Sequence, residues 1–292
     1  MGVRGSRTSP PPSSSPVQGE ERWPWSASNR PLTNVPPCAR CVSSEMVALT
    51  FEIDPQEVLR LQGYRRASDI PTSEVLDILR AAMVEARQVF QPRWIYQEFP
   101  VDSADDSGVR LADGPELVIR EIPGRWGGIS ALGIALCTIG DGLEARIEAL
   151  FAAREFPAAY MLDSLGSVAV EALGEAVHRR ICEDRLAQGL KVTPRESPGY
   201  ARWAIEEQPK VFALLSTGTI GVHLNPYCIM TPRKSVSFAV GIGRDAIMGA
   251  GGSPCRACDM RDCAYRRAPR RQAHESAWAA EVAPLILAAT AA

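Results

Sequence analysis

The amino-acid sequence predicts an α+β fold, built as one principal domain with an appendage at each end. Helix-periodic segments and β-rich segments are mixed irregularly, without the regular spacing of roughly 30 residues that marks βαβ units. The run Gly241-Ile242-Gly243 lacks the third glycine of a dinucleotide-binding fingerprint. With 292 residues, 46% of them hydrophobic, the chain has enough apolar material for a sizeable core.

Composition and charge exclude several functional classes. The formal net charge is −2, so no overall basic field favours nucleic acid. The charge-free stretch 126–140 is shorter than the ~18–20 apolar residues that span a bilayer, and it contains four glycines. Eight cysteines are too few for a disulfide scaffold. We therefore expect a cytoplasmic protein that binds neither nucleic acid nor membrane.

The two ends of the chain differ in composition from its middle. Residues 1–45 are rich in proline and serine and lack the apolar core of a secretory signal, which predicts a disordered tail or a start site assigned upstream of Met46. The principal domain is expected to span residues 46–245. A cysteine-cluster segment then covers 246–272, and a helical tail covers 273–292.

Capping and periodicity define the elements of the first half. Asp54 and Pro55 predict a short helix that ends near residue 61. A second helix should run from residue 72 or 73 to 90, with an apolar face made of Val75, Leu76, Leu79, Met83 and Val84. Strands are expected at 94–99 and 116–122, with a polar loop at 102–114 between them.

The second half should contain the longest helix. A strand is expected at 134–139, followed by a helix over 143–154 that Asp141 caps. The longest helix should span 158–188, because Leu162, Leu165, Ala169, Leu173 and Ala176 repeat at helical spacing. A helix near 205–215, a strand near 220–224 and a β-rich run at 236–242 complete the prediction.

Three cysteines form the strongest spacing signal, Cys255-x-x-Cys258-x-x-x-x-Cys263. Thiolates at this spacing can converge on one metal, and Cys228 is the candidate fourth ligand. Seven arginines and three aspartates in residues 244–271 suit thiolate ligands and an anionic cluster. The spacing leaves zinc and an iron–sulfur cluster both open.

A second signal is the sequence Arg195-Glu196-Ser197-Pro198-Gly199-Tyr200. An arginine can bind a carboxylate through two hydrogen bonds, and a glycine lets a ligand approach the backbone closely. Glu171 lies roughly 150° from the apolar stripe of the longest helix, so its carboxylate faces away from that stripe. These residues are candidates for a binding site.

These residues resemble a known family. Arg195-x-x-x-Gly199-Tyr200 is similar to the S-adenosylmethionine-binding signature in the activation domain of cobalamin-dependent methionine synthase. Two further stretches resemble that family in the same order: the Glu-rich helix at 170–181, and the strand and loop formed by Ile220-Gly221-Val222-His223-Leu224 and Met230-x-Pro232-x-x-Ser235-Val236-Ser237. The chain departs from the family at Asn225-Pro226-Tyr227, where Thr-Glu-Ser is usual, and at Phe238, where glycine is usual.

The resemblance implies a fold and a site. The fold would be a single activation-type α+β domain of mixed, mainly antiparallel sheet with packed helices, to which the cysteine-rich segment is appended. Glu171, Arg195, Gly199 and Tyr200 would bind S-adenosylmethionine: Arg195 its carboxylate, Glu171 its ammonium and sulfonium, and Tyr200 its adenine and ribose.

The resemblance also implies a function, with alternatives. The cobalamin-binding pattern Asp-x-His-x-x-Gly is missing from the sequence. We therefore expect a free-standing activation component that supports reductive methylation of cobalamin on a separate methionine synthase or other corrinoid protein. The cysteine cluster could then receive an electron from a donor protein. The alternatives are a non-catalytic scaffold with a structural zinc, and a methyltransferase for another corrinoid partner.

Overall fold

The computed structural model of the chain describes residues 49–65, 69–200 and 202–248. The cysteine cluster and both predicted tails lie outside these ranges. In the described part the helices are α1 Pro55–Leu61, α2 Ser73–Val89, α3 Ile122–Trp126, α4 Gly142–Ala152, α5 Phe156–Leu186 and α6 Gln208–Leu214, with 3₁₀ turns η1 at Ile205–Glu207 and η2 at Thr217–Ile220. Among these residues no helix combines the length and apolar character needed to cross a bilayer.

The strands form one main antiparallel sheet and two small pairs. The strands are β1 Arg93–Ala104, β2 Val109–Leu111, β3 Glu116–Leu117, β4 Gly127–Gly128, β5 Ala131–Thr138, β6 Lys191–Val192, β7 His223–Leu224, β8 Met230–Thr231, β9 Ser235–Gly243 and β10 Asp245–Ala246. The main sheet has the order β3-β2-β1-β5-β9-β6, and the pairs β4–β10 and β7–β8 lie outside it. All of its neighbouring strands are antiparallel.

The side chains of the central strands alternate between two cores. One face of the sheet packs on α5, which in turn packs on α1, α2 and α4. The buried strand residues of this core are Ala135, Cys137, Val192, Phe238, Val240 and Ile242. The other face packs on α3, α6 and the loops around Trp203, through Ile95, Leu132, Ile134, Leu136 and Ala239. Both faces of the central strands are therefore covered, which explains why the sequence of β5 is almost continuously apolar.

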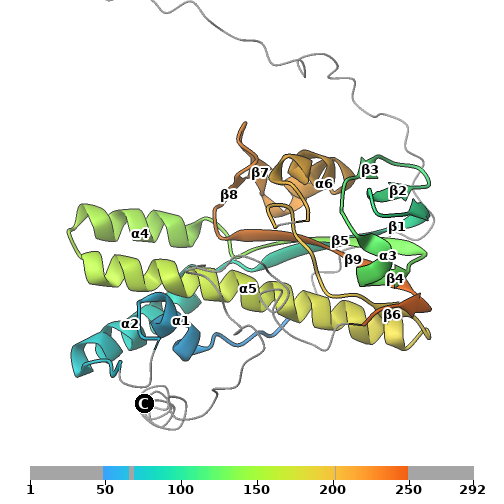
Figure 1. Ribbon diagram of the computed structural model, residues 1–292. Coiled ribbons are helices and arrows are strands. Elements are labelled where there is room, and N and C mark those ends of the chain that lie inside the picture. The colour runs from blue at the N-terminus through green and yellow to red at the C-terminus, as the bar shows by residue number, and fades with distance from the viewer. Residues whose placement is uncertain (1–48, 66–68, 201, 249–292) are drawn as a thin grey trace, which may run out of the picture. The chain divides into compact units, whose positions relative to one another are not determined.

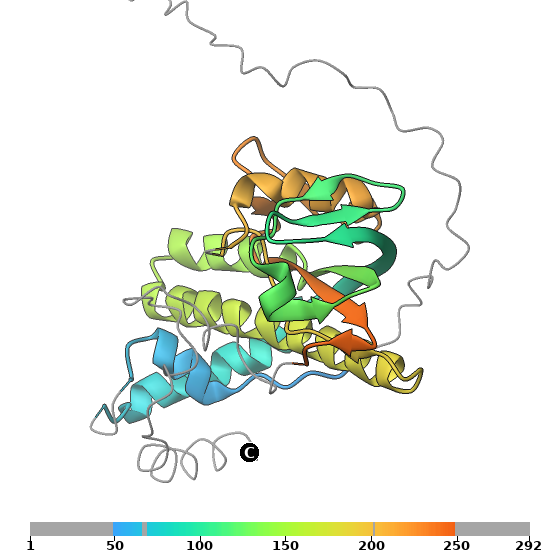
Figure 2. The same cartoon turned by 45° about the vertical axis from the view of Figure 1, so that its right-hand side comes forward.

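Helix α5 is the central helix of the fold. Figures 1 and 2 show it between the sheet on one side and α1 and α2 on the other. It therefore buries residues on two opposite sides, with Met161 and Val168 on one side and Val170 and Val177 on the other. Its polar side chains are confined to the remaining strip, which includes Glu171.

The helices expected within the described residues are present, with end points shifted by a few residues. Asp54 Oδ1 accepts a hydrogen bond from the backbone N–H of Gln56 at 2.9 Å, as its capping role predicts. Val84, expected on the apolar face of α2, is 57% exposed. The buried positions of α2 are Leu76, Leu79, Ala82 and Ala86, and Val84 lies outside that stripe.

The strand predictions were wrong in two regions, 102–122 and 220–224. The polar loop expected at 102–114 contains the end of β1 and all of β2, which pair as a hairpin with Val101 opposite Leu111. The strand expected at 116–122 shrinks to β3, because Ile122 and Pro123 already begin α3. The strand expected at 220–224 is a 3₁₀ turn followed by the two-residue strand β7.

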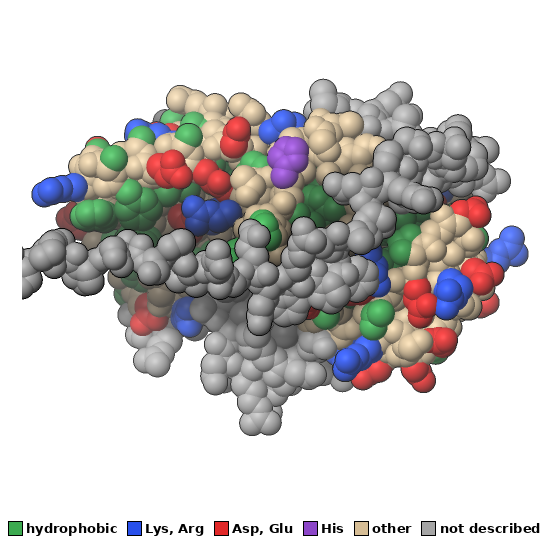
Figure 3. Space-filling model, turned by 90° about the horizontal axis from the view of Figure 1, so that it is seen from above, with side chains coloured by type: hydrophobic (Ala, Val, Ile, Leu, Met, Phe, Trp, Pro, Cys, Tyr) green, Lys and Arg blue, Asp and Glu red, His purple; other side chains and the backbone are tan. Residues whose placement is uncertain are grey.

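Acidic and basic side chains are interspersed on the surface of the described residues. In the view of Figure 3, red and blue groups alternate across the face rather than gathering by sign. Several of these groups form exposed pairs, such as Arg180 with Asp184 at 2.9 Å and Arg110 with Glu116 at 2.6 Å. Such pairs contribute little to stability because water screens them.

Candidate ligand cavity on helix α5

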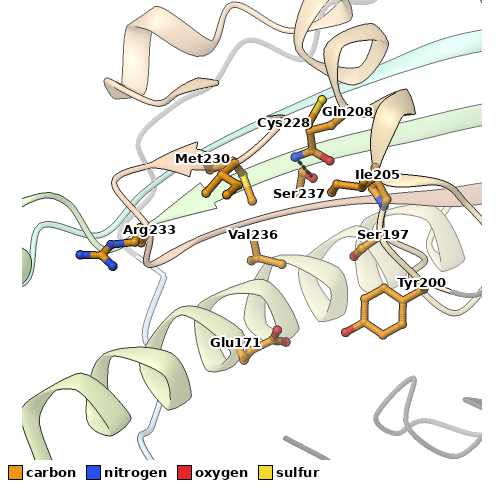
Figure 4. Close-up of a pocket in the computed structure, with 12 residues that line it drawn as sticks. Glu171, Ser197, Tyr200, Ile205, Gln208, Cys228, Met230, Arg233, Val236 and Ser237 are labelled. Carbon is orange, nitrogen blue, oxygen red and sulfur yellow. Dashed lines mark hydrogen bonds between the residues drawn. The ribbon is translucent and has the colours of Figure 1, made fainter. Parts of the chain in front are cut away.

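A cavity of about 290 Å³ lies between α5, the loop after β6 and the β7–β8 hairpin (Figure 4). Of the residues proposed from the sequence, Glu171, Tyr200 and Cys228 line it. The other lining residues are Ser197, Pro198, Ile205, Gln208, Ile229, Met230, Arg233, Val236 and Ser237. Side chains that are far apart in the sequence thus meet at one place.

Glu171 and Arg233 are the charged residues that line the cavity, and Glu171 lies on its α5 wall. Arg195 Nη2 donates to Glu171 Oε2 at 3.0 Å, and the same nitrogen lies 3.5 Å from Glu175 Oε2. The Arg195 side chain is 7% exposed, whereas that of Glu171 is 25% exposed. The structure therefore places Arg195 beside Glu171. Arg195 is not a lining residue of the cavity, although the Glu171 carboxylate that it contacts is.

Close packing holds the Arg195 guanidinium in place. Its carbon lies 5.7 Å from the centre of the Phe238 ring, a cation–π contact. A Cβ placed on Gly174 would come within 2.7 Å of Arg195 Nη1, so glycine at this position leaves room for the guanidinium against α5. Phe238, the departure from the family's usual glycine, is fully buried and supplies this ring.

The loop that carries Gly199 and Tyr200 is fixed by backbone hydrogen bonds. Gly199 has a φ of +93°, which few residues other than glycine adopt. Its N–H donates to the Trp203 carbonyl at 2.8 Å, and the Trp203 N–H donates to the Tyr200 carbonyl at 2.9 Å. The neighbouring Glu196 pairs with Arg125. This tight turn presents Tyr200 at the cavity, where the residue is 38% exposed.

The β7–β8 hairpin closes the cavity opposite α5. Asn225 Oδ1 accepts hydrogen bonds from the N–H groups of Tyr227 and Ile229 at 2.9 and 3.0 Å. Cys228 follows in a left-handed conformation, with a φ of +60°. Tyr227 is 80% exposed. The departure from the family at Asn225-Pro226-Tyr227 therefore produces a side-chain-stabilised turn in which Asn225 replaces a backbone acceptor.

A buried polar pair links α6 to β9. Gln208 Nε2 donates to Ser237 Oγ at 2.8 Å, and the two residues are 1% and 2% exposed. Figure 4 shows Gln208 between Cys228 and Ile205, on the wall away from Glu171. Sequence reasoning missed Gln208 because a glutamine near the start of a short helix resembles an ordinary surface residue. Ser237 lies within the stretch quoted for the resemblance, but it was not singled out.

Of the four cysteines proposed as metal ligands, only Cys228 lies among the described residues. Cys228 lies in the hairpin, whereas Cys255, Cys258 and Cys263 lie outside the described residues. Within the described ranges, no group of three or more His, Cys, Asp or Glu residues is arranged to hold a metal ion. Cys137 is fully buried in β5, and this burial raises the pKa of its thiol to about 12.

Comparison with known proteins identifies the fold. No protein-family model matches the chain, and no curated protein matches it. Among solved structures, the crystal structure of the MetH reactivation domain bound to AdoHcy matches with 16% sequence identity and a TM-score of 0.50, over 64% of this chain and 74% of that one. A likeness at this identity shows the fold, and it confirms the predicted α+β domain with an antiparallel sheet and packed helices.

Proposed function

We propose that the chain binds S-adenosylmethionine in the cavity on α5 and acts as an activation component for a cobalamin-dependent methyltransferase. The observation that carries the proposal is the meeting of Glu171 and Tyr200 at one cavity in a chain with the reactivation-domain fold. The solved neighbour was crystallised with AdoHcy, the product that remains when S-adenosylmethionine gives up its methyl group.

The charges on this side of α5 suit a cationic ligand. Arg195 pairs with Glu171 and Glu175, and the Glu171 side chain is still 25% exposed at the cavity. An ammonium or sulfonium placed there would contact the Glu171 carboxylate directly. Arg195 then acts as a positioning residue, because it holds the Glu171 carboxylate at the edge of the cavity.

The chain would contribute by placing the ligand. In the proposed reaction, cob(II)alamin on the partner takes up one electron, the cobalt attacks the sulfonium methyl, and the carbon–sulfur bond breaks to leave S-adenosylhomocysteine. Tyr200, on the rim, would pack on the flat adenosyl group, while Glu171 holds the charged end. Holding the methyl group toward the partner is a proximity effect and requires no acid or base from this chain.

The cysteine cluster would serve the reductive step in the same proposal. Cys255, Cys258 and Cys263, with Cys228 as a fourth candidate, would bind an iron–sulfur cluster that passes the electron from a donor protein. Anaerobic purification tests this directly. A brown protein that absorbs near 400 nm supports redox work, whereas one equivalent of zinc and no colour favours a structural site and the scaffold alternative.

Calorimetric titration with S-adenosylmethionine tests the ligand. We expect binding by the unaltered chain, and binding at least about tenfold weaker in Glu171→Gln, because one charge-assisted contact is lost. Asp163→Asn is the matched control, since Asp163 also lies on α5 and pairs with a cation, Lys234, at 2.8 Å, but does not line the cavity. No heat from the unaltered chain, or equal losses in both variants, would contradict the proposal.

A second experiment tests the partner. A methionine synthase that lacks its own activation domain is prepared in the cob(II)alamin form and mixed with the chain, S-adenosylmethionine and a reductant. The visible spectrum should convert to that of methylcobalamin only when the chain is present. Conversion at the same rate without the chain would exclude the activation role, even if the ligand binds.

A further inference from the structure

Gln208 presents an unusual buried atom at the cavity. Its Nε2 donates a hydrogen bond to Ser237 Oγ. Its Oε1 is buried and accepts no hydrogen bond from any of the described residues. Buried carbonyl oxygens are rarely left without a donor, because desolvation is then not compensated. An acceptor of this kind on a cavity wall is suited to a donor that arrives with a ligand.

The position of Gln208 is fixed from both sides. Ser237 lies in the middle of β9, opposite Leu136 of β5. Glu207, the residue before Gln208, accepts from the backbone N–H of Val118 at 2.9 Å and pairs with Lys210 at 2.8 Å. The contacts of Glu207 hold the start of α6 in place, and turning the glutamine amide away from the cavity would break its hydrogen bond to Ser237 of β9.

The surroundings of Gln208 make its oxygen selective. The nearby lining residues Ile205, Met230 and Val236 are apolar, so a donor placed there has few other partners in the cavity wall. Figure 4 shows Ile205 beside the amide, and Ile205 is 38% exposed, so its side chain can turn outward to admit a ligand atom. A site that accepts a hydrogen bond from an N–H or O–H group discriminates strongly against analogues that lack it.

We propose that Gln208 Oε1 accepts a hydrogen bond from the nucleoside part of the ligand and so determines specificity for it. This inference rests on the proposed function. Glu171 and Gln208 lie on opposite walls (Figure 4), so a ligand whose charged end is at Glu171 extends its nucleoside toward Gln208. The available donors are the adenine amino group and the ribose hydroxyls.

Competition between matched nucleosides tests the assignment. S-adenosylhomocysteine is compared with three analogues. One is S-inosylhomocysteine, in which a carbonyl replaces the adenine amino group, and the others are the 2′-deoxy and 3′-deoxy forms of S-adenosylhomocysteine. The variant is Gln208→Met combined with Ser237→Ala, which removes both partners of the buried pair and leaves neither unpaired. Asp163→Asn is the control, because Asp163 does not line the cavity. Circular dichroism and thermal melting confirm that each variant is folded.

We expect the unaltered chain and Asp163→Asn to bind S-adenosylhomocysteine about tenfold or more tightly than one of the analogues. The double variant should bind S-adenosylhomocysteine and that analogue equally. The group that this analogue lacks is then the donor to Gln208 Oε1. A preference that persists in the double variant, or no preference in the unaltered chain, would overturn the role of Gln208 while the proposed function stands. Failure of the unaltered chain to bind any nucleoside would overturn both.

Discussion

The two walls of the cavity are built in opposite ways. The α5 wall depends on a contact between distant segments, in which Arg195 reaches back 24 residues to Glu171. The hairpin wall depends on local contacts, in which Asn225 binds N–H groups two and four residues ahead. The first wall is charged and supported by the main core, whereas the second carries a strained Cys228. We therefore expect substitutions in the α5 wall to affect stability most.

Removing the Arg195 charge should have the largest effect. Arg195→Met keeps much of the packing on Phe238 but leaves two carboxylates without their cation. We expect a loss of about 3 kcal/mol in the free energy of unfolding, near the low end for a broken buried pair because Glu171 and Glu175 remain partly exposed to water. Urea denaturation measures the loss.

Arg180→Met is the control for that substitution. Arg180 also lies on α5 and pairs with an acid, Asp184, but both side chains are about half exposed. We expect no measurable change in the free energy of unfolding. If both substitutions lowered the free energy of unfolding equally, the Arg195 pairs in the α5 wall would contribute no more to stability than an exposed surface pair.

Crowding the guanidinium should have an intermediate effect. In Gly174→Ala the added methyl group must displace Arg195 Nη1, and overpacking of this kind typically costs about 1–3 kcal/mol. The better helix propensity of alanine offsets about 1 kcal/mol of that cost. We expect a net destabilisation of about 1 kcal/mol by denaturation. Gly218→Ala, where a Cβ meets nothing within 4 Å, should not be destabilised by crowding.

Relaxing the hairpin should have a smaller effect of the opposite sign. Cys228→Gly removes the penalty of a left-handed side-chain residue, about 1–2 kcal/mol, and adds about 0.5–1 kcal/mol of chain entropy. We expect a net stabilisation of about 0.5 kcal/mol. Cys228→Ser keeps the strain and should show no gain. If both variants raised the melting temperature equally, the gain would come from removing the thiol and not from relieving backbone strain.

His178 should give the smallest effect, through pH. It lies on α5, and burial lowers the pKa of its imidazole below the ordinary value of 6.5. The Thr193 carbonyl, 3.0 Å from Nε2, and Glu175 oppose this shift, whereas Arg195 adds to it. The unfolded chain therefore binds the proton more readily, so stability falls as pH drops below 6.5 and levels off below the folded pKa. His178→Gln should remove this part of the pH dependence in denaturation curves taken between pH 5 and 8, a window chosen to bracket roughly the ordinary His pKa.

Much of the fold could be predicted because its helices are long and periodic. The stripe of α5 and the cap at Asp54 rest on local rules that the sequence states directly. The β1–β2 hairpin was missed because β2 has only three residues and the end of β1 is largely polar and exposed, so residues 102–114 resemble a loop. Val84 was misplaced because an apolar residue beside a helix stripe can face solvent without large cost.

The site was predictable only in part, for a similar reason. Gly199 and Tyr200 belong to a short motif that can be read directly from the sequence, and Glu171 belongs to the Glu-rich helix at 170–181. The partnership of Gln208 with Ser237 depends on how α6 packs against β9, and no local pattern reports such a tertiary contact. Arg195 was expected to face the ligand directly. In this structure its guanidinium binds two acids of α5, because Gly174 leaves space for it there.

Protection of Cys228 from alkylation is the most direct test that S-adenosylmethionine occupies this cavity. Cys228 lines it, whereas Cys182 on α5 does not and is similarly half-buried. The chain is treated with iodoacetamide over a range of S-adenosylmethionine concentrations, and each cysteine is followed by peptide mass spectrometry. We expect the ligand to slow modification of Cys228 and leave Cys182 unchanged. An unchanged rate at Cys228 with saturating ligand would contradict binding in the cavity on α5.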